Sequence, residues 1–231
     1  MAPSVLDPTG MRSKDGQLYS LQVCAPAEEV PMEPCVEIAA VGWTHPDWLG
    51  GYYPPDLPED WRLAYYANEY RAVLVPAPVL DRAGVESVSR WCGEVPERFR
   101  FYFELEDAFT ERDDRRLLLD AAAGCLGGFV LEASPERAPC IERALVRRFP
   151  ATDVVRRGAP PGVHRLWMPG VSGPTGPVGL VRWPEPPQPA ELRAQLEGFV
   201  AASGGGGTLF LDAGPEVLER ARDLLLVMGW L

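Results

Sequence analysis

Short apolar runs alternate with amphipathic stretches along most of the chain. The first run, residues 36–43 (VEIAAVGW), is apolar and rich in β-branched residues, which is typical of a buried strand. Asp56 and Glu59 follow at the spacing of a helix-capping box. Behind them the pattern predicts a helix whose buried face is formed by Leu63, Tyr66, Ala67 and Tyr70.

The same alternation continues toward the C-terminus. Further strands are predicted at 72–79, 99–105, 127–131 and 208–212. Helices are predicted at 81–92, 113–125, 141–149, 192–200 and 217–228. Nine prolines between positions 160 and 189 exclude a long helix there, so we expect loops around two short strands, at 164–168 and 179–183.

Near-continuous apolar strands that alternate with helices predict an α/β fold with a mostly parallel sheet. A closed (β/α) barrel and an open doubly wound sheet both fit. No GxGxxG motif follows the first strand, so the dinucleotide-binding form of the open sheet lacks its marker. We expect one domain over residues 35–231. Residues 1–34 are polar and proline-rich, which predicts a partly disordered extension with one candidate strand at 17–25.

Charge and rare residues narrow the chemistry. The net charge of −11 disfavours binding to nucleic acid or to a membrane surface, and the close pairs Arg147-Arg148 and Arg156-Arg157 are expected at solvated ends of elements. Lys14 is the sole lysine, which argues against a Schiff-base lysine and a Walker phosphate loop. His45 and His164 are too few for a zinc site of three histidines.

The compartment is predicted from the cysteines and the start of the chain. The five cysteines include no CxxC pair, and an odd number predicts free thiols in a reducing cytoplasm. No basic start followed by an apolar stretch marks a secretory signal, and the longest uncharged apolar run, 121–131, is too short to cross a bilayer. We therefore expect a soluble cytoplasmic protein without metal or cofactor.

One segment is more specific than these patterns. Residues 42–70 (GWTHPDWLGGYYPPDLPEDWRLAYYANEY) resemble the opening motif of the YecE-like family, domain of unknown function seventy-two. Weaker matches follow in order at 91–101, 181–183 and 208–229. The resemblance covers about residues 36–231 and implies a TIM-barrel-like fold, here incomplete or irregular, in a diverged and shortened member. The family has no settled activity.

The sequence departs from the family at polar positions. The acidic residue and asparagine that end the family's second strand correspond to Leu74 and Pro76. A family lysine corresponds to Glu104, a family glutamine to Glu132, and the aromatic residue after Gly-Trp to His45. The polar site of the family is thus largely rewritten in this chain.

The site of a (β/α) barrel lies at the C-terminal ends of its strands. There His45 is either a general base or a residue that fills the aromatic slot and hydrogen-bonds the loop, and Glu104 and Glu132 are further catalytic candidates. Arg182 either holds an anionic group or forms an internal salt bridge. Three roles are open for Glu104, Glu132 and Asp212. Two of them act as an acid pair, or they bind a hard cation, or they merely cap helices and face solvent. The candidate ligand-binding residues are Trp43, Trp48, Tyr53, Arg182 and Asp212.

Two functions fit this set. One is a non-catalytic barrel that binds a small molecule, anionic or sugar-like, or serves as a scaffold. The alternative is a small-molecule hydrolase, lyase or isomerase that uses the acidic and aromatic face. The loss of the polar pair at Leu74 and Pro76 favours the non-catalytic reading. The oligomeric state leaves no signal in the sequence.

Overall fold

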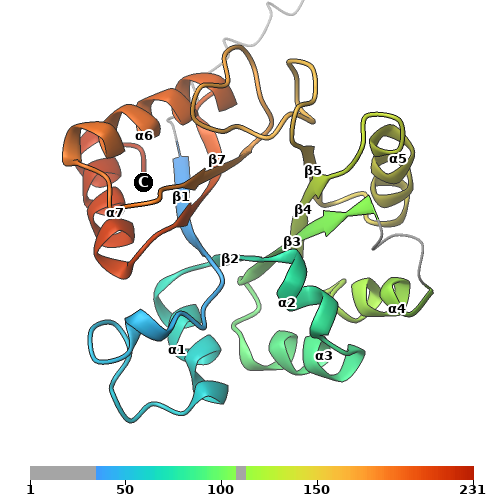
Figure 1. The fold of residues 1–231 in the computed structure, drawn as a ribbon, viewed down its shortest axis with the longest axis horizontal. Helices are drawn as coiled ribbons and strands as arrows, with labels where there is room; N and C mark the ends of the chain where they lie inside the picture. The colour runs from blue at the N-terminus through green and yellow to red at the C-terminus, as the bar shows by residue number, and fades with distance from the viewer. Residues whose placement is uncertain (1–34, 108–112) are drawn as a thin grey trace, which may run out of the picture. The chain divides into compact units, whose positions relative to one another are not determined.

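Seven parallel strands surrounded by helices form the fold (Figure 1). The computed structural model describes residues 35–107 and 113–231, so the extension predicted for 1–34 lies outside the described residues. The strand order is β5-β4-β3-β2-β1-β7-β6. The strands are β1 Cys35–Val41, β2 Ala72–Val75, β3 Arg100–Glu106, β4 Leu126–Glu132, β5 Asp153–Arg156, β6 Val178–Arg182 and β7 Gly206–Asp212. The helices are α1 Arg62–Glu69, α2 Ala77–Arg82, α3 Val85–Glu94, α4 Asp113–Ala121, α5 Ala138–Arg148, α6 Pro189–Ser203 and α7 Pro215–Met228, with short 3-10 turns η1 Pro46–Trp48 and η2 Glu59–Trp61.

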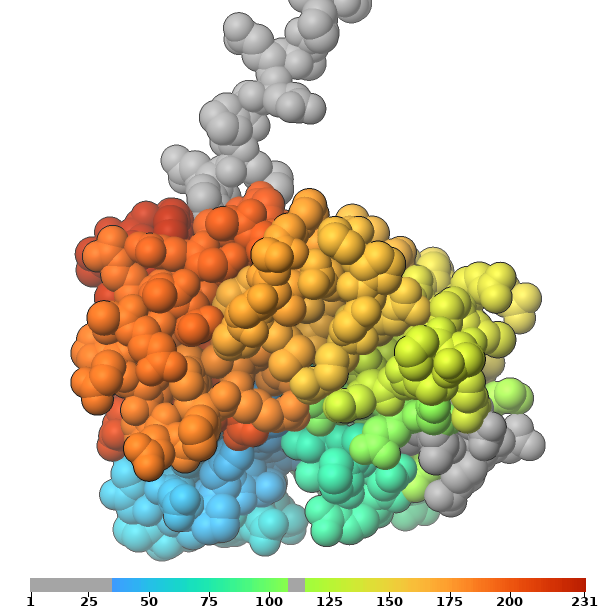
Figure 2. All heavy atoms as spheres, turned by 45° about the horizontal axis from the view of Figure 1, so that its top comes forward, coloured from blue at the N-terminus to red at the C-terminus, as the bar shows by residue number. Residues whose placement is uncertain are grey.

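A loop segment links the two outer strands of the sheet, β5 and β6. The Leu166 N–H donates to the Arg156 carbonyl at 3.0 Å, and the Trp167 N–H donates to the Val178 carbonyl at 3.0 Å. The strand predicted at 164–168 therefore exists only as isolated bridges, because its neighbours are proline-rich loops. In Figure 2 the surrounding segment, yellow to orange, fills the face between α5 and α6. The predicted TIM-barrel-like fold is confirmed in an incomplete form.

Alternate residues of each strand face opposite sides of the curled sheet. The inner side holds small and medium apolar groups, joined by two aromatic rings: Ala39, Val41, Ala72, Leu74, Tyr102, Val130, Val155, Leu166, Val178, Leu180 and Phe210. The outer side packs against the helices. Most of the buried aromatic residues lie in this layer, among them Phe101, Phe103 and Phe129 of the strands, Tyr66 of α1 and Phe199 of α6. The sheet is thus buried on both faces, which explains its near-continuous apolar strands.

Tyr66 fastens α1 to the sheet. Its ring is fully buried, and its hydroxyl accepts the Ala40 N–H and donates to the Ala72 carbonyl, both at 2.8 Å. Strands β1 and β2 pair over only two residues, so this hydroxyl satisfies backbone groups where the ladder is short. The predicted helix stripe is confirmed, since Leu63, Ala67 and Tyr70 are buried with it.

Two glycines in β4 make room for Tyr102. A Cβ at Gly127 would lie 2.5 Å from the Tyr102 ring. A Cβ at Gly128 would lie 2.5 Å from the Asp153 carbonyl oxygen and 2.8 Å from the same ring. Because real Cβ atoms essentially never come so close to other atoms, both positions strongly favour glycine. The ring of Tyr102 lies against the first residues of β4, on the inner side of the sheet.

Element boundaries differ from the prediction where proline or charge interrupts the pattern. Strand β2 ends at Val75, because Pro76 precedes α2, and the helix predicted at 81–92 is divided between α2 and α3 near Gly84. Strand β5 was not predicted, since only Val154 and Val155 are apolar in its four residues. Arg156 and Arg157 are half-buried rather than solvated, and each lies near a carboxylate.

The prediction of free thiols is wrong for one pair of cysteines. Cys92 of α3 and Cys125, just before β4, form a disulfide with their Cα atoms 5.9 Å apart. Their separation of 33 residues follows no pairing motif, so the bond could not be predicted from spacing. Cys35 and Cys140 are free and exposed.

Candidate functional site at the C-terminal ends of the strands

An arginine joins two carboxylates across the mouth of the barrel. Arg182, at the end of β6, places its Nη2 2.5 Å from Glu104 Oε1 and its Nε 3.3 Å from Asp212 Oδ2. Asp212 lies on the neighbouring strand β7, but β1 and β2 separate β7 from β3, which carries Glu104. The Arg182–Glu104 contact therefore spans the inner side of the curled sheet. Of the alternatives for Arg182, the structure shows the internal salt bridge.

Because Glu104 is buried, its contact with Arg182 is important for stability. Glu104 is only 8% exposed, so its charge would be costly without a cationic partner. Partial burial of Arg182 lowers its pKa, but the hydrogen bonds and charges of Glu104 and Asp212 outweigh this effect and raise the pKa overall. The guanidinium is thus held in its charged form, and its bonds keep both carboxylates in place.

A second ion pair lies beside the first. Glu132 at the end of β4 has Oε1 3.3 Å from the Nε of Arg157, which directly follows β5. The Glu132 side chain is 58% exposed, so solvent screens this pair much more than the Arg182 pair. Glu132 occupies the predicted rim, but its charge is already compensated.

His45 follows β1 and is fixed against the loop that it begins. Its Nε2 lies 2.5 Å from the Val41 carbonyl oxygen, and its ring stacks on Trp48 with a centroid distance of 4.7 Å. Because a carbonyl oxygen only accepts, Nε2 must carry the proton, which leaves Nδ1 as the acceptor. No contact found among residues 35–107 and 113–231 joins His45 to Glu104 or Glu132.

A hollow of about 470 Å³ lies at this end of the barrel, next to the ion pairs. His45, Trp48 and Asp212 line it, so it adjoins the Arg182 contact through Asp212. Residues that follow β6 and β7 complete it, including Trp183 and Glu216. Trp183 is half-exposed and its Nε1 donates to Glu191 at 3.1 Å, which orients the indole ring.

The three aromatic candidates occupy structural positions. Gly42 has φ +73°, which ends β1 and turns the chain, and Trp43 then packs on the outer side of the sheet 5.1 Å from the ring of Trp91. The Tyr53 hydroxyl donates to the Trp43 carbonyl at 2.8 Å, and Tyr53 is fully buried. Trp48 is also buried but reaches the hollow. The structure therefore brings Trp48, Arg182 and Asp212 together and places Trp43 and Tyr53 elsewhere.

Several residues that line the hollow were not predicted from the sequence. Asp47, Trp183, Glu185 and Glu216 all line it, and all lie within a few residues of β1, β6 or β7. Their position just after predicted strands was the available signal. Arg157 was likewise grouped with solvated basic pairs, although it follows β5.

The described part of the chain contains neither a metal-binding cluster nor a helix that could span a membrane. There, no three His, Cys, Asp or Glu side chains come together in an arrangement suited to a metal ion. None of the helices in 35–107 and 113–231 combines the length and apolarity that a membrane span needs.

The fold is that of an incomplete (β/α)-barrel-like protein in which charged side chains pair at the C-terminal strand ends. Residues 37–145 match the family model described as "Protein of unknown function DUF72". No curated protein matches the chain significantly. Given this match, the resemblance to the YecE-like family is confirmed over residues 37–145.

Solved structures agree with this fold. Two crystal structures of a DUF72 family protein from Enterococcus faecalis V583 are similar to the chain. One has a TM-score of 0.53 at 13% identity, over 84% of this chain and 95% of that chain. The other has 0.52 at 12% identity, over 85% and 98%. A DUF72 family protein from Thermotoga maritima MSB8 matches with 0.42 at 12% identity, over 84% and 99%.

Proposed function

We propose that this protein is a non-catalytic barrel that binds a small, neutral, hydroxyl-rich molecule in the hollow at its mouth. The observation that carries the proposal is the position of Arg182 between Glu104 and Asp212. A general acid or base needs a proton or lone pair that faces the substrate. Here the carboxylates face an arginine of the same chain instead.

The other catalytic candidates support the same reading. Glu132 is paired with Arg157, and no contact among the described residues joins His45 to Glu104 or Glu132. A mutual acid–base arrangement would need these groups within hydrogen-bond reach of one another. The polar groups of the mouth stabilise the strand ends, and we infer that they form a rigid wall of a binding site.

The lining of the hollow favours one class of ligand. Four carboxylates line it, from Asp47, Glu185, Asp212 and Glu216, and would repel an anion. Carboxylates accept hydrogen bonds from hydroxyl groups, and the indole of Trp183 offers an apolar face to the C–H side of a sugar. Between the anionic and the sugar-like ligand, we therefore favour the sugar-like one.

A cytoplasmic location remains part of the proposal. The Cys92–Cys125 bond counts against it, because stable disulfides are rare in the cytosol. Two measurements on cells that express the chain would test these points. Alkylation of free thiols before lysis reports whether Cys92 and Cys125 are bonded, and fractionation after lysis reports the location. Recovery outside the cytoplasm would contradict the location.

The binding proposal is tested by calorimetric titration with a panel of neutral monosaccharides and polyols and with their phosphorylated forms. We expect a neutral member to bind and Trp183→Ala to weaken its binding at least fivefold. The matched control is Trp61→Ala, since Trp61 is 68% exposed and lines no part of the hollow. Tighter binding of the phosphorylated forms would contradict the ligand class. Turnover of a panel member that Glu104→Gln abolishes would establish an enzyme instead.

A further inference from the structure

Arginine side chains gather around a second hollow, between α4 and α5, although the chain carries a net charge of −11. Its volume is about 750 Å³, within the range of small-molecule sites. It shares no lining residue with the hollow at the barrel mouth. Among the described residues, one carboxylate lines it, that of Glu136, and five arginines do so: Arg115, Arg116, Arg137, Arg147 and Arg148.

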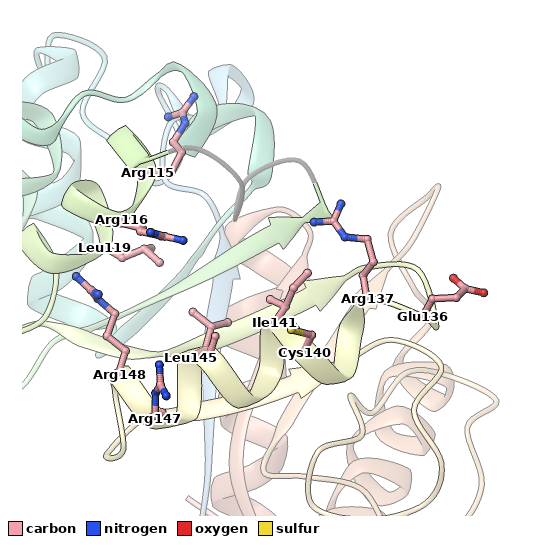
Figure 3. Close-up of a pocket in the computed structure, with 11 residues that line it drawn as sticks. Arg115, Arg116, Leu119, Glu136, Arg137, Cys140, Ile141, Leu145, Arg147 and Arg148 are labelled. Carbon is pink, nitrogen blue, oxygen red and sulfur yellow. The ribbon is translucent and has the colours of Figure 1, made fainter.

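The floor of this hollow is apolar. Leu119 of α4 and Ile141, Ala144 and Leu145 of α5 line it between the arginines. Figure 3 shows Leu119 facing Ile141 and Leu145 across the gap between the two helices. A purely inorganic anion would leave this apolar surface unused, whereas an apolar ring system would cover it.

The arginines form a rim around this floor. In Figure 3 Arg116 and Arg137 point into the gap from opposite sides, and Glu136 points away from it. Arg137 is the N-cap of α5, and Arg147 and Arg148 lie in its last turn, so cationic groups lie near both ends of the floor. Positive charge in such a concave, partly apolar site attracts anions more strongly than the same charge on an open surface.

Not every arginine of the rim contributes equally. Arg115 donates to the Leu80 carbonyl at 3.1 Å and contacts the Asp81 carboxylate at 3.3 Å, so it holds α4 against α2. Arg148 forms an exposed pair with Asp120. Arg147 has no carboxylate partner among the described residues. The test centres on Arg116, which points into the gap, and on Arg147, so that each helix contributes one arginine.

We propose that the groove between α4 and α5 binds an organic anion with an apolar body, such as an aromatic sulfonate or carboxylate. The apolar body covers Leu119, Ile141 and Leu145, and the anionic group meets the arginine rim. The site is independent of the barrel mouth, and its ligand is of the opposite chemical kind.

The probe is anilinonaphthalene sulfonate, whose fluorescence rises on binding, compared with its uncharged analogue phenylnaphthylamine. We expect the anion to bind the full chain at least tenfold more tightly than the neutral analogue, and its affinity to fall as salt is added. Arg116→Gln combined with Arg147→Gln should weaken it about tenfold, the result of two screened charge contacts. Arg193→Gln combined with Arg220→Gln, on α6 and α7, is the matched control and should leave the affinity unchanged.

Cys140 supplies an independent measurement, because it lines the groove and its thiol is free and exposed. Bound anilinonaphthalene sulfonate should slow the alkylation of Cys140 by N-ethylmaleimide at least twofold and leave Cys35, at the start of β1, unchanged. The same protection should persist in Trp183→Ala, which separates this groove from the barrel mouth. Equal affinity for the charged and neutral probes, or alkylation of both thiols at unchanged rates, would overturn the proposal.

Discussion

The two ends of the barrel interior treat buried acidic groups in opposite ways. At the C-terminal end Glu104 meets Arg182, and the carboxylates of Glu104 and Asp212 raise the pKa of Arg182. At the N-terminal end Asp153 accepts a hydrogen bond from the Tyr102 hydroxyl at 3.1 Å. Burial raises the pKa of Asp153, and this hydrogen bond offsets only part of the rise.

The difference shows which end is organised by charge. Tyr102 has its pKa raised by burial and by the nearby charge of Asp153, so it remains a neutral hydrogen-bond donor at ordinary pH. The N-terminal end therefore holds Asp153 through a neutral hydrogen-bond donor rather than through a cation. The C-terminal end keeps full charges in a fixed geometry, beside a hollow that opens to solvent. Substitutions at the two ends should accordingly differ in size, sign and pH dependence.

The largest effect is expected for Arg182→Met. It leaves Glu104 buried without a cation, which costs about 2 kcal/mol of unfolding free energy after allowance for the partial exposure of Arg182. Urea denaturation near neutral pH measures this loss. A loss within about 0.3 kcal/mol of zero would contradict the charge-based account.

Tyr102→Phe should destabilise the N-terminal end by about 1 kcal/mol, because it removes the hydrogen bond to Asp153 and keeps the ring over Gly127 and Gly128. The pKa of Asp153 should rise further in this variant, since one group that lowers it is lost. Thermal unfolding and a carboxyl titration by NMR measure the two effects. An unchanged pKa of Asp153 would show that the hydroxyl does not bond to it.

Asp153→Asn should have the opposite sign and raise the melting temperature by a few degrees near neutral pH. A carboxyl whose pKa is raised in the folded state destabilises that state above the folded pKa, because the charge must stay buried. This cost fades as the pH falls through the folded pKa and is gone below the unfolded value of 3.8. The two proteins should therefore unfold alike in strong acid. A variant that is less stable than the parent at neutral pH would show that the buried charge of Asp153 carries no such cost.

The smallest effect is expected for Arg157→Gln. Its partner Glu132 is 58% exposed, so the pair contributes at most about 0.5 kcal/mol. Chemical denaturation in parallel with Arg182→Met provides the comparison within the same rim. Equal losses at Arg157 and Arg182 would mean that burial does not decide the strength of these pairs.

Periodicity alone predicts the layers of this fold well. The parity of each strand places Glu104, Arg182 and Asp212 on the inner side of the sheet, the side that also carries Tyr102. The structure confirms that Glu104, Arg182 and Asp212 lie together at the C-terminal end. The alternation of apolar runs and helix stripes needs no tertiary information. The element that it misses, β5, is too short and too polar at its ends to give a pattern.

What the sequence does not predict depends on single backbone turns and on long-range pairing. Trp43 was expected at the mouth, but the positive φ of Gly42 turns it to the outer layer. The partners of Arg182 were left open, because the choice between ligand and carboxylate depends on how far the sheet curls. The Cys92–Cys125 bond is likewise a consequence of helix packing rather than of spacing.

A double-mutant cycle between Glu104 and Arg182 tests most directly whether the mouth is held by its own charges. The unfolding free energies of the parent, Arg182→Met, Glu104→Gln and the double variant give the coupling between the two side chains. We predict a favourable coupling of about 1.5–2 kcal/mol near neutral pH. A coupling within about 0.3 kcal/mol of zero would contradict the account, since it would leave Glu104 free to act on a substrate.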